Sequence, residues 1–480
     1  MSNQYSPNRR QVLRAGLASL LAPATRAGTR PPNVIFFLTD DHGSWAANCY
    51  GCSDMHTPHL DRLAAEGARF TRAYACTPVC SASRMTYLTG KLPSHHGVQD
   101  WLMGDDSVGP KAHPFLKGQT AFSDVLASNG YIVGLTGKWH MGGDEHAHAS
   151  FSYWATVPGA GGTYKDPVFV KNGQQVPTQG YKTNHVGDYA FEFIEQNHER
   201  PFCLYCPFYA PHVPYDYQPE DFRRYYNNSK FPCFPNEPIH PWHTRTIMGN
   251  LRFPMLDDFN NRESKLSYSA LVTGMDYNIG RVLQRLEELR IRENTVIVFS
   301  ADQGHNCGHH GIWGKGNATV PINMYDTSLH VPLIWNHPGR IPARQTPTPM
   351  VSSYDFFPTL LDYLGIQAAP EPHRVGRSYA RFLRGESPSW HNELYFEYQY
   401  VRGIRTEDMK YVERTKEWPS ELFDLETDPG ERQNVIDDPR HAAQLTALRA
   451  RLTDFFQKTG APPIGQWRTT TTQDLCTYGR

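Results

Sequence analysis

The sequence predicts an α/β fold: a large, mostly parallel central sheet flanked by helices, followed by a smaller subdomain with an antiparallel sheet and a helix. Five apolar, β-branched runs of strand length alternate with segments of helical spacing, and this alternation is typical of parallel strands covered on both faces. Towards the C-terminus the pattern changes to short strands separated by turn residues, which predicts an antiparallel meander.

In the larger part, which we place at residues 31–369, each predicted strand is a buried apolar run. The strands cover 34–38, 131–135, 202–208, 296–299 and 331–335. Thr57-Pro58 opens the first helix, since proline fits the first helical position, and helical spacing recurs over 121–127, 188–194, 266–289 and 352–364. The segments 143–183 and 216–262 fit neither pattern, and loops of this length usually carry substrate contacts or are mobile.

The smaller part, residues 370–480, is predicted to be a C-terminal subdomain. Aromatic and β-branched runs over 394–401, 409–412 and 421–425 are separated by turn residues, so we expect them to be the strands of its sheet. Apolar residues at helical spacing from about 440 to 456 predict a closing helix.

Composition and charge exclude several classes of protein. The 480 residues include 47 Lys and Arg and 48 Asp and Glu, and the net charge of −1 argues against charge-driven attraction to nucleic acid or an anionic membrane. Hydrophobic residues make up 39% and charged residues 20%, which excludes a chain that is disordered by composition. We find no stretch of about 20 apolar residues and therefore expect no membrane span.

The first 30 residues are set apart from the predicted fold. Arg9-Arg10 precedes a small, apolar stretch over 15–24, and this arrangement resembles a twin-arginine export signal. A disordered basic tail is the alternative. An export signal would direct the protein to the periplasm or the exterior, whereas without one the protein would be cytoplasmic.

Two predicted strands end in acidic residues. Asp40 and Asp41 follow the first strand, and Asp302 and Gln303 follow the strand over 296–299. The carboxyl ends of strands form the ligand crevice of an open α/β sheet, where adjacent carboxylates would repel each other unless a cation lies between them. Oxygen ligands favour a hard ion such as Ca²⁺ or Mg²⁺. Each segment by itself is also compatible with an ordinary turn.

Cys80 and Arg84 form a third candidate segment. Cys80 precedes a predicted helix, whose free N–H groups and dipole favour an anion, and Arg84 returns to the same face about one turn later. An anion at residue 80 would therefore meet a guanidinium group. The pattern alone allows either a reactive thiolate or a buried structural cysteine.

The segment Cys80-Ser-Ala-Ser-Arg84, with Leu88-Thr89-Gly90, resembles the signature of the type I sulfatases of the alkaline phosphatase-like superfamily, in its Cys-x-Ala-x-Arg form. The likeness runs from Asn33–Asp41 to Glu421–Gly430, which is most of the chain. It implies that a formylglycine-generating maturation enzyme converts Cys80 to formylglycine. The aldehyde hydrate would then be both the nucleophile and a metal ligand, and Arg84 would help to hold it.

The resemblance implies roles for four further basic side chains. Lys138 would bind the sulfate and His140 would act on the formylglycine hydroxyl; strand alternation would place both on one side of an extended segment. His212 would contact the ester oxygen and protonate the leaving alcohol. Lys315 is the best match for a further cation, although Asn317 to Asn323 lengthens the gap after it. Gln303 also departs from the family pattern, since Asn or His often stands there.

Several other polar residues invite an interpretation. The resemblance places the loop after Asp302 at the rim of the active site and so implies that His305 contacts substrate, although a solvated loop is the alternative. Asp100 and Trp101, shortly after the signature helix, are further candidates for contact at the rim. The pairs Cys49/Cys52 and Cys203/Cys206 suggest zinc, but the second pair lies in a strand, where positions three apart face opposite sides. Nine cysteines is an odd number, and Cys80 is our candidate for a special, unpaired thiol.

Together these residues predict metal-assisted hydrolysis of a sulfate monoester of a sugar or an aryl alcohol, carried on a small molecule or a glycan. Ca²⁺ or Mg²⁺ would be held by Asp40, Asp41, Asp302, Gln303 and the converted Cys80. Two alternatives stay open. Relatives with the same nucleophile and metal cage cleave phosphonate monoesters or phosphodiesters, and a non-catalytic relative would bind a sulfated glycan with Cys80 unmodified.

Overall fold

The computed structural model describes residues 30–102, 107–109, 112–159, 161–243, 247–248, 251–252, 255–415 and 417–466. The predicted export signal lies outside these residues. From Pro32 onward the chain forms one compact unit. The boundary proposed at residue 370 stays a prediction, drawn from the change in the type of secondary structure.

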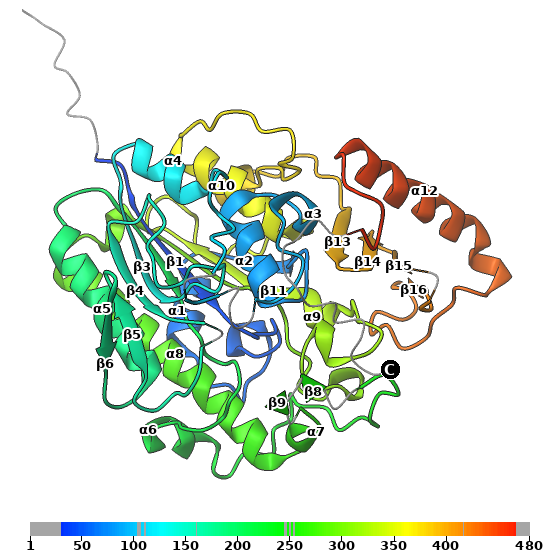
Figure 1. Ribbon diagram of the computed structural model, residues 1–480, viewed down its shortest axis with the longest axis horizontal. Coiled ribbons are helices and arrows are strands. Elements are labelled where there is room, and N and C mark those ends of the chain that lie inside the picture. The colour runs from blue at the N-terminus through cyan, green and yellow to red at the C-terminus, as the bar shows by residue number, and fades with distance from the viewer. Residues whose placement is uncertain are drawn as a thin grey trace, which may run out of the picture. The chain divides into compact units, whose positions relative to one another are not determined.

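The core of this unit is a sheet of ten strands (Figure 1). In chain order they are β1 (Asn33–Thr39), β2 (Ala68–Tyr74), β3 (Ile132–Lys138), β4 (Tyr153–Val157), β5 (Val168–Lys171), β6 (Gln174–Pro177), β7 (Phe202–Pro207), β10 (Thr295–Ala301), β11 (His330–Asn336) and β12 (Val351–Ser352). Their order across the sheet is β12-β2-β11-β10-β1-β7-β3-β4-β5-β6. The five central strands from β10 to β4 are parallel, and antiparallel pairs lie at both sides.

Twelve described α-helices accompany the strands. They are α1 (Pro58–Ala65), α2 (Cys80–Thr89), α3 (Pro93–His96), α4 (Phe122–Ser128), α5 (Lys182–Asn197), α6 (Glu220–Arg223), α7 (Met255–Asp258), α8 (Arg262–Glu288), α9 (Asp326–Leu329), α10 (Phe356–Leu364), α11 (Ala380–Leu383) and α12 (Ala442–Lys458). The predicted mostly parallel sheet with flanking helices is therefore confirmed.

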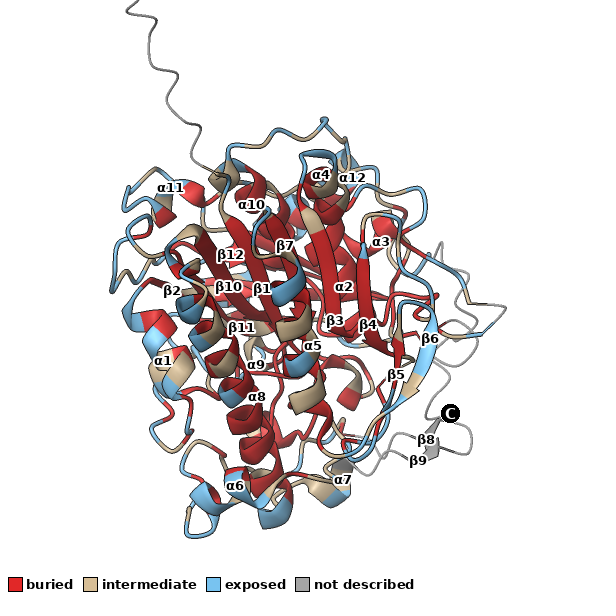
Figure 2. Cartoon of the chain, turned by 90° about the vertical axis from the view of Figure 1, so that its left-hand side faces the viewer, coloured by how far each residue is buried: buried red, intermediate tan, exposed pale blue. Residues whose placement is uncertain are grey.

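The alternation of side chains along β1 divides the core into two layers. Phe36 points to the layer formed with α2, α4 and α10, where its ring stacks on Phe356 at 4.3 Å between centroids. Ile35 and Phe37 point to the opposite layer, formed with α1, α5 and α8. Figure 2 shows α1, α5 and α8 in front of the sheet, with their buried sides against the strands. Burial on both faces explains the near-continuous apolar runs in the sequence.

The C-terminal meander is present as β13 (Leu394–Tyr398), β14 (Val401–Arg405), β15 (Met409–Arg414) and β16 (Glu421–Asp424), and all neighbours pair antiparallel. Figure 1 shows this small sheet and α12 on the side of the unit opposite β5 and β6. One prediction here is wrong. The run over 394–401 is two strands with a turn at Gln399 and Tyr400, where Gln399 has a φ of 51°. No Gly, Pro or Asn marks this turn, so the sequence reads as one strand.

The two segments that fit no pattern contain short elements. Residues 143–183 contain β4, β5 and β6, and residues 216–262 contain α6 and a two-stranded sheet of β8 (Ile247–Met248) and β9 (Leu251–Arg252). Strand β2 was also not predicted, because Arg69 and Arg72 interrupt its apolar residues. No helix in the described ranges combines the length and hydropathy that a membrane crossing requires.

The cysteines do not form a zinc site in the described part of the chain. Cys52 forms a disulfide with Cys233, while Cys49 is a free thiol. Cys203 and Cys206 pack into opposite layers of the core, as expected for strand positions three apart. The disulfide therefore links the loop after β1 to the segment 216–262.

Removal of this disulfide is expected to destabilise the protein. The two cysteines are 181 residues apart, and a crosslink over so long a loop restricts the unfolded chain, so the double variant Cys52→Ala/Cys233→Ala should lose about 2–4 kcal/mol of unfolding free energy. Denaturant unfolding of the oxidised proteins measures the loss. Cys49→Ala, which removes the nearby free thiol, is the matched control and should change stability far less. Equal stability of the double variant and the wild type would contradict this expectation.

Candidate active site

The carboxyl ends of β1 and β10 bring the predicted acidic residues together. The two strands are parallel neighbours with Thr39 opposite Ala301, so Asp40 and Asp302 follow side by side. Asp302 Oδ1 accepts the main-chain N–H groups of Asp41 at 3.3 Å and Gln303 at 2.9 Å. Asp41 has a φ of 61° and its carbonyl accepts the Tyr268 hydroxyl at 2.9 Å. This turn directs the acidic side chains into one buried cluster.

Helix α2 carries Cys80 and Arg84 into the same cluster. The helix begins at Cys80 itself, after the extended Val79, rather than just beyond it as the sequence suggested. Arg84 is fully buried; its Nε and Nη2 lie 3.0 and 2.8 Å from Asp302 Oδ2, and Nη2 lies 3.1 Å from Asp40 Oδ2. Cys80 Sγ lies 3.4 Å from Asp40 Oδ1. The guanidinium group therefore joins both strand ends one helical turn from Cys80.

Two lysines complete the cluster. Lys138 Nζ, at the end of β3, donates to Asp40 Oδ2. Lys315 Nζ donates to Asp41 Oδ1 at 2.6 Å and lies 2.7 Å from Cys80 Sγ. The longer segment after Lys315 folds back, because the Asn323 amide donates to the carbonyl of Lys315 at 3.1 Å. The lengthened gap thus leaves Lys315 inside the cluster.

Buried charges shift the pKa values of this cluster in opposite directions. Burial alone would raise the pKa of Asp40, but Lys138, His212 and Arg84 hold it well below its usual value. Burial, and then Asp40, raise the pKa of the Cys80 thiol to about 12, which outweighs the lowering by Lys138 and Lys315. An unmodified Cys80 is therefore a protonated thiol at neutral pH, despite the ammonium group beside it.

The two predicted histidines have defined protonation patterns. His140 Nε2 lies 2.8 Å from the Leu102 carbonyl, which can only accept, so this nitrogen carries the proton. His140 Nδ1 is buried without a hydrogen-bond partner, and burial followed by Lys138 holds the pKa of the ring well below its usual value. In His212, Nδ1 donates to the Val213 carbonyl, and Nε2 lies 3.6 Å from Asp41 Oδ2.

One prediction about Lys138 and His140 is wrong in its geometry. Strand β3 ends at Lys138, and His140 has a φ of 58°, so side-chain alternation does not continue to His140. The two residues therefore have different local backbone conformations. Gly137, still within β3, has a φ of 124° and lies so close to the Pro207 carbonyl that a Cβ would overlap it.

The donor set fits a hard divalent cation. Asp40, Asp41 and Asp302 supply carboxylate oxygens, and Gln303 Oε1 is buried without a hydrogen-bond partner, while its Nε2 donates to Asp41 Oδ1 at 2.6 Å. Rotation of the amide would turn that oxygen towards the carboxylates. Cys80, Asp40 and His212 also each offer one ligand atom within 4.8 Å of the others. Oxygen-rich sites of this kind suit Ca²⁺ or Mg²⁺.

The rim residues lie in three different settings. Asp100 is buried and accepts from Tyr398 at 2.8 Å and from Gln399 at 2.6 Å, both at the β13–β14 turn. Trp101 is half-buried next to it. His305 is buried, and its Nδ1 lies 3.1 Å from Cys307 Sγ. Sequence reasoning missed the contact between the C-terminal sheet and Asp100, because no turn residue marks the turn at Gln399.

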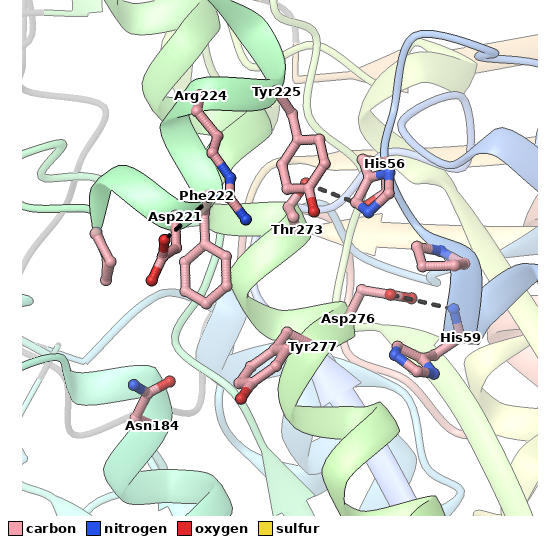
Figure 3. A pocket seen from close by; sticks show the side chains of 12 residues that line it. His56, His59, Asn184, Asp221, Phe222, Arg224, Tyr225, Thr273, Asp276 and Tyr277 are labelled. Atoms are coloured by element: carbon pink, nitrogen blue, oxygen red, sulfur yellow. Dashed lines mark hydrogen bonds and ion pairs between the residues drawn. The ribbon is translucent and has the colours of Figure 1, made fainter.

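A separate cavity of about 340 Å³ lies on another part of the surface (Figure 3). Figure 3 shows residues from α6, α8 and the start of α1 around it, among them Phe222, Tyr277 and His59. Asp276 points from α8 to the start of α1 and accepts the main-chain N–H groups of His59 and Leu60. None of the cluster residues described above lines this cavity.

A mostly parallel sheet whose strand ends gather carboxylates and cations around the start of a helix is the architecture of the alkaline phosphatase-like hydrolases. Residues 32–366 match the family described as Sulfatase, and residues 308–458 match the one described as N-sulphoglucosamine sulphohydrolase, C-terminal. The chain therefore belongs to the sulfatase family, and it is an enzyme that hydrolyses sulfate esters.

A named relative and one solved structure agree with this assignment, and a further solved structure shares the fold. An N-acetylglucosamine-6-O-sulfatase of Bacteroides thetaiotaomicron is 28% identical, with 90% of this chain and 87% of the relative covered. A solved structure in complex with D-glucosamine-2-N,6-O-disulfate has a TM-score of 0.77 at 26% identity, over 91% of this chain and 100% of that one. The phosphonate monoester hydrolase of Agrobacterium radiobacter shares the fold, with a TM-score of 0.72 at 22% identity over 89% and 96% of the chains.

Proposed function

We propose that this sulfatase hydrolyses a sulfate monoester of a sugar, with a nucleophile made from Cys80 and with a divalent cation, Ca²⁺ or Mg²⁺. The observation that carries the proposal is the position of Cys80 Sγ, which lies 3.4 Å from Asp40 and 2.7 Å from Lys315 within the buried cluster. The named activity of the bacterial relative and the ligand of the similar solved structure support a sugar sulfate, with the 6-O-sulfate of a glucosamine unit as the first ester to test.

A thiol at residue 80 would be a poor nucleophile, and conversion of Cys80 to formylglycine would replace it with a better one. The raised pKa of Cys80 leaves little thiolate to attack an ester at neutral pH. A formylglycine at this position supplies a hydrated aldehyde with two hydroxyl groups, one to attack and one to release the product. Maturation therefore requires a formylglycine-generating enzyme as a partner.

The cation would be held by Asp40, Asp41, Asp302 and Gln303. When bound, such an ion lowers the pKa of a hydroxyl group and polarises an ester oxygen. Arg84, Lys138 and Lys315, which already surround the carboxylates, would offset the negative charge that develops on the sulfate oxygens. Hydrogen bonds to the carboxylates hold all three basic side chains in place, so these side chains need little reorganisation when the substrate binds.

The histidines are suited to proton transfer. His140 is neutral, with its proton on Nε2, so its free Nδ1 can accept a proton from residue 80. His212 is about four-fifths buried, and burial outweighs the opposing effect of Asp40 and Asp41, so that its pKa is lowered to about 4. An anionic ester next to Nε2 would raise this lowered pKa, which favours a protonated ring that can donate to the leaving alcohol.

The mass of the tryptic peptide Ala73–Arg84 tests the proposal directly. We expect an aldehyde at residue 80 when the protein is produced with a formylglycine-generating enzyme and an unmodified cysteine when it is not. Hydrolysis of a glucosamine 6-O-sulfate should rise in proportion to the converted fraction. Activity that is independent of conversion would refute the nucleophile, and faster cleavage of the matching phosphonate or phosphate ester would favour a phosphorus-ester hydrolase instead.

A further inference from the structure

Lys182 is a buried lysine to which the proposed reaction gives no role. It is the first residue of α5, where a positive charge faces the positive end of the helix dipole, and its side chain has no exposed surface. Its Nζ donates to the carbonyl oxygens of Gly161 and Gly162, the latter at 2.7 Å. Among the described residues it forms no ion pair with a carboxylate. Burying a lysine in this way is costly, so its contacts call for an explanation.

These hydrogen bonds do not depend on the charge of Lys182. Burial pulls its pKa well below the usual value, Asp216 raises it, and Lys138 lowers it. An ammonium group and a neutral amine can both donate two hydrogen bonds, so Gly161 and Gly162 are held in either protonation state.

The two hydrogen bonds hold Gly161 and Gly162, which we call the glycine loop, close to the rings of Tyr164 and Tyr209. Lys182 Nζ lies 4.0 Å from the centroid of the Tyr209 ring and 5.0 Å from that of Tyr164. Gly161 has a φ of 126°, and its Cα lies so close to the Tyr209 ring that a Cβ would overlap it. The rings of Tyr164 and Tyr209 contact each other at 5.2 Å. Lys182, the glycine loop and both rings form one packed unit.

Both tyrosines hold the chain at His212. The Tyr164 hydroxyl donates to the His212 carbonyl at 2.8 Å, and the Tyr209 hydroxyl donates to the Val213 carbonyl. The Tyr209 ring also packs on the imidazole, with 5.0 Å between centroids and 32° between planes. The Val213 carbonyl in turn accepts from His212 Nδ1, which fixes the ring so that Nε2 faces Asp41.

We propose that Lys182 is a positioning residue that acts through Tyr164 and Tyr209 to hold His212 at the ester oxygen of the substrate. The proposal rests on the proposed role of His212 as the acid for the leaving alcohol. Without the amine, the glycine loop loses its anchor, the face of Tyr209 is uncovered, and the chain around His212 gains freedom. Such a loss affects the transfer of a proton to the leaving group more than it affects the attack at sulfur.

Two esters of different leaving groups test the proposal. A sugar alcohol needs a proton as it leaves, whereas 4-nitrophenolate leaves readily without one. For Lys182→Met, which keeps the length of the side chain, we expect kcat on glucosamine 6-O-sulfate to fall about 10-fold or more and kcat on 4-nitrophenyl sulfate to change by less than about threefold. Lys182→Arg, which can still donate to carbonyls, should recover part of the loss.

Three controls separate the possible outcomes. Lys165→Met removes an exposed lysine from the same loop and should leave both activities unchanged. His212→Ala should show the same preference between the esters as Lys182→Met, with a larger loss. If His212→Ala slows both esters equally, the acid role of His212 fails; if it discriminates and Lys182→Met does not, the proposal for Lys182 fails. A crystal structure of Lys182→Met in which His212 keeps its place would also overturn it.

Discussion

Cys80→Ala is expected to lose essentially all hydrolysis, with kcat reduced by about 10⁴-fold or more, because no other nucleophile of the described cluster can replace residue 80. The fold should persist, since the side chain loses only one sulfur atom and the hydrogen bonds of Arg84 to Asp302 and Asp40 do not involve it. The measurement is kcat on glucosamine 6-O-sulfate for proteins produced with the maturation enzyme, together with thermal unfolding.

Cys76→Ala is the matched control for this variant. Cys76 is also a buried free cysteine, and burial raises its pKa to about 12, but its Sγ lies 3.3 Å from the Thr86 hydroxyl and outside the acidic cluster. Its replacement should leave kcat within about threefold of the wild type.

Cys80→Ser, produced without a maturation enzyme, gives a second test of the nucleophile. A serine has a single hydroxyl, so it could accept sulfate once but could not release it by re-forming an aldehyde. Undiminished activity of Cys80→Ala would contradict the proposed nucleophile, and undiminished binding of a sulfated glycan without turnover would support a binding protein.

The position of the acidic residues could be predicted because parallel strands end at the same edge of a sheet. Asp40 and Asp302 are 262 residues apart in the sequence, yet the pairing of β1 with β10 places them side by side. The return of Arg84 to the face of Cys80 could be predicted for a similar reason, since it follows from helical periodicity, although α2 begins at Cys80 itself and not just beyond it. Regular backbone geometry carries both predictions.

Irregular backbone explains what the sequence did not reveal. Gln399 has a positive φ, a conformation usually adopted by glycine or asparagine, so the sequence does not indicate a turn there. This turn places the Tyr398 hydroxyl within hydrogen-bonding distance of Asp100. His140 leaves the strand geometry in the same way, with a φ of 58°. Such conformations in residues other than glycine depend on their tertiary contacts and not on local propensity.

Contacts between loops that are distant in the sequence could not be predicted either. The disulfide joins Cys52 to Cys233, not to its neighbour Cys49, because pairing depends on proximity in the folded chain. Lys182 reaches Gly161 and Tyr209 across segments that have no periodic pattern. For such contacts the chain must be folded before the partners can be named.

Removal of divalent cations is expected to abolish hydrolysis, and the charges of the cluster give the reason. Three carboxylates, Asp40, Asp41 and Asp302, face three cations, Arg84, Lys138 and Lys315. Burial and Asp40 raise the pKa of Asp302 to about 7, but the Arg84 guanidinium donates to it from Nε and lies 2.8 Å from it through Nη2, so we count it as ionised. The cluster alone therefore has no net charge to attract an anionic ester, whereas a dication makes it positive.

Chelation should accordingly lower kcat/KM by about 10³-fold or more, since a metal ion contributes several kcal/mol of charge stabilisation. The protein is dialysed against a chelator, metal removal is verified by elemental analysis, and Ca²⁺ and Mg²⁺ are added back in separate titrations. Recovery with one of them identifies the preferred ion. Full activity in protein shown to be free of metal would contradict the proposed centre.

Asp302→Asn should separate the loss of a ligand from a general loss of charge. The substitution keeps the shape of Asp302, which accepts hydrogen bonds from Arg84 and from the N–H groups of Asp41 and Gln303. We expect the cation to bind about 100-fold more weakly or worse, because even the loss of an outer partner of a metal ligand lowers affinity by about 10–100-fold. Asp188→Asn, which removes a half-exposed carboxylate on α5, is the control and should not alter the affinity. Calorimetric titration with Ca²⁺ measures both. Equal affinities in the two variants would show that Asp302 holds Arg84 in place without contacting the ion.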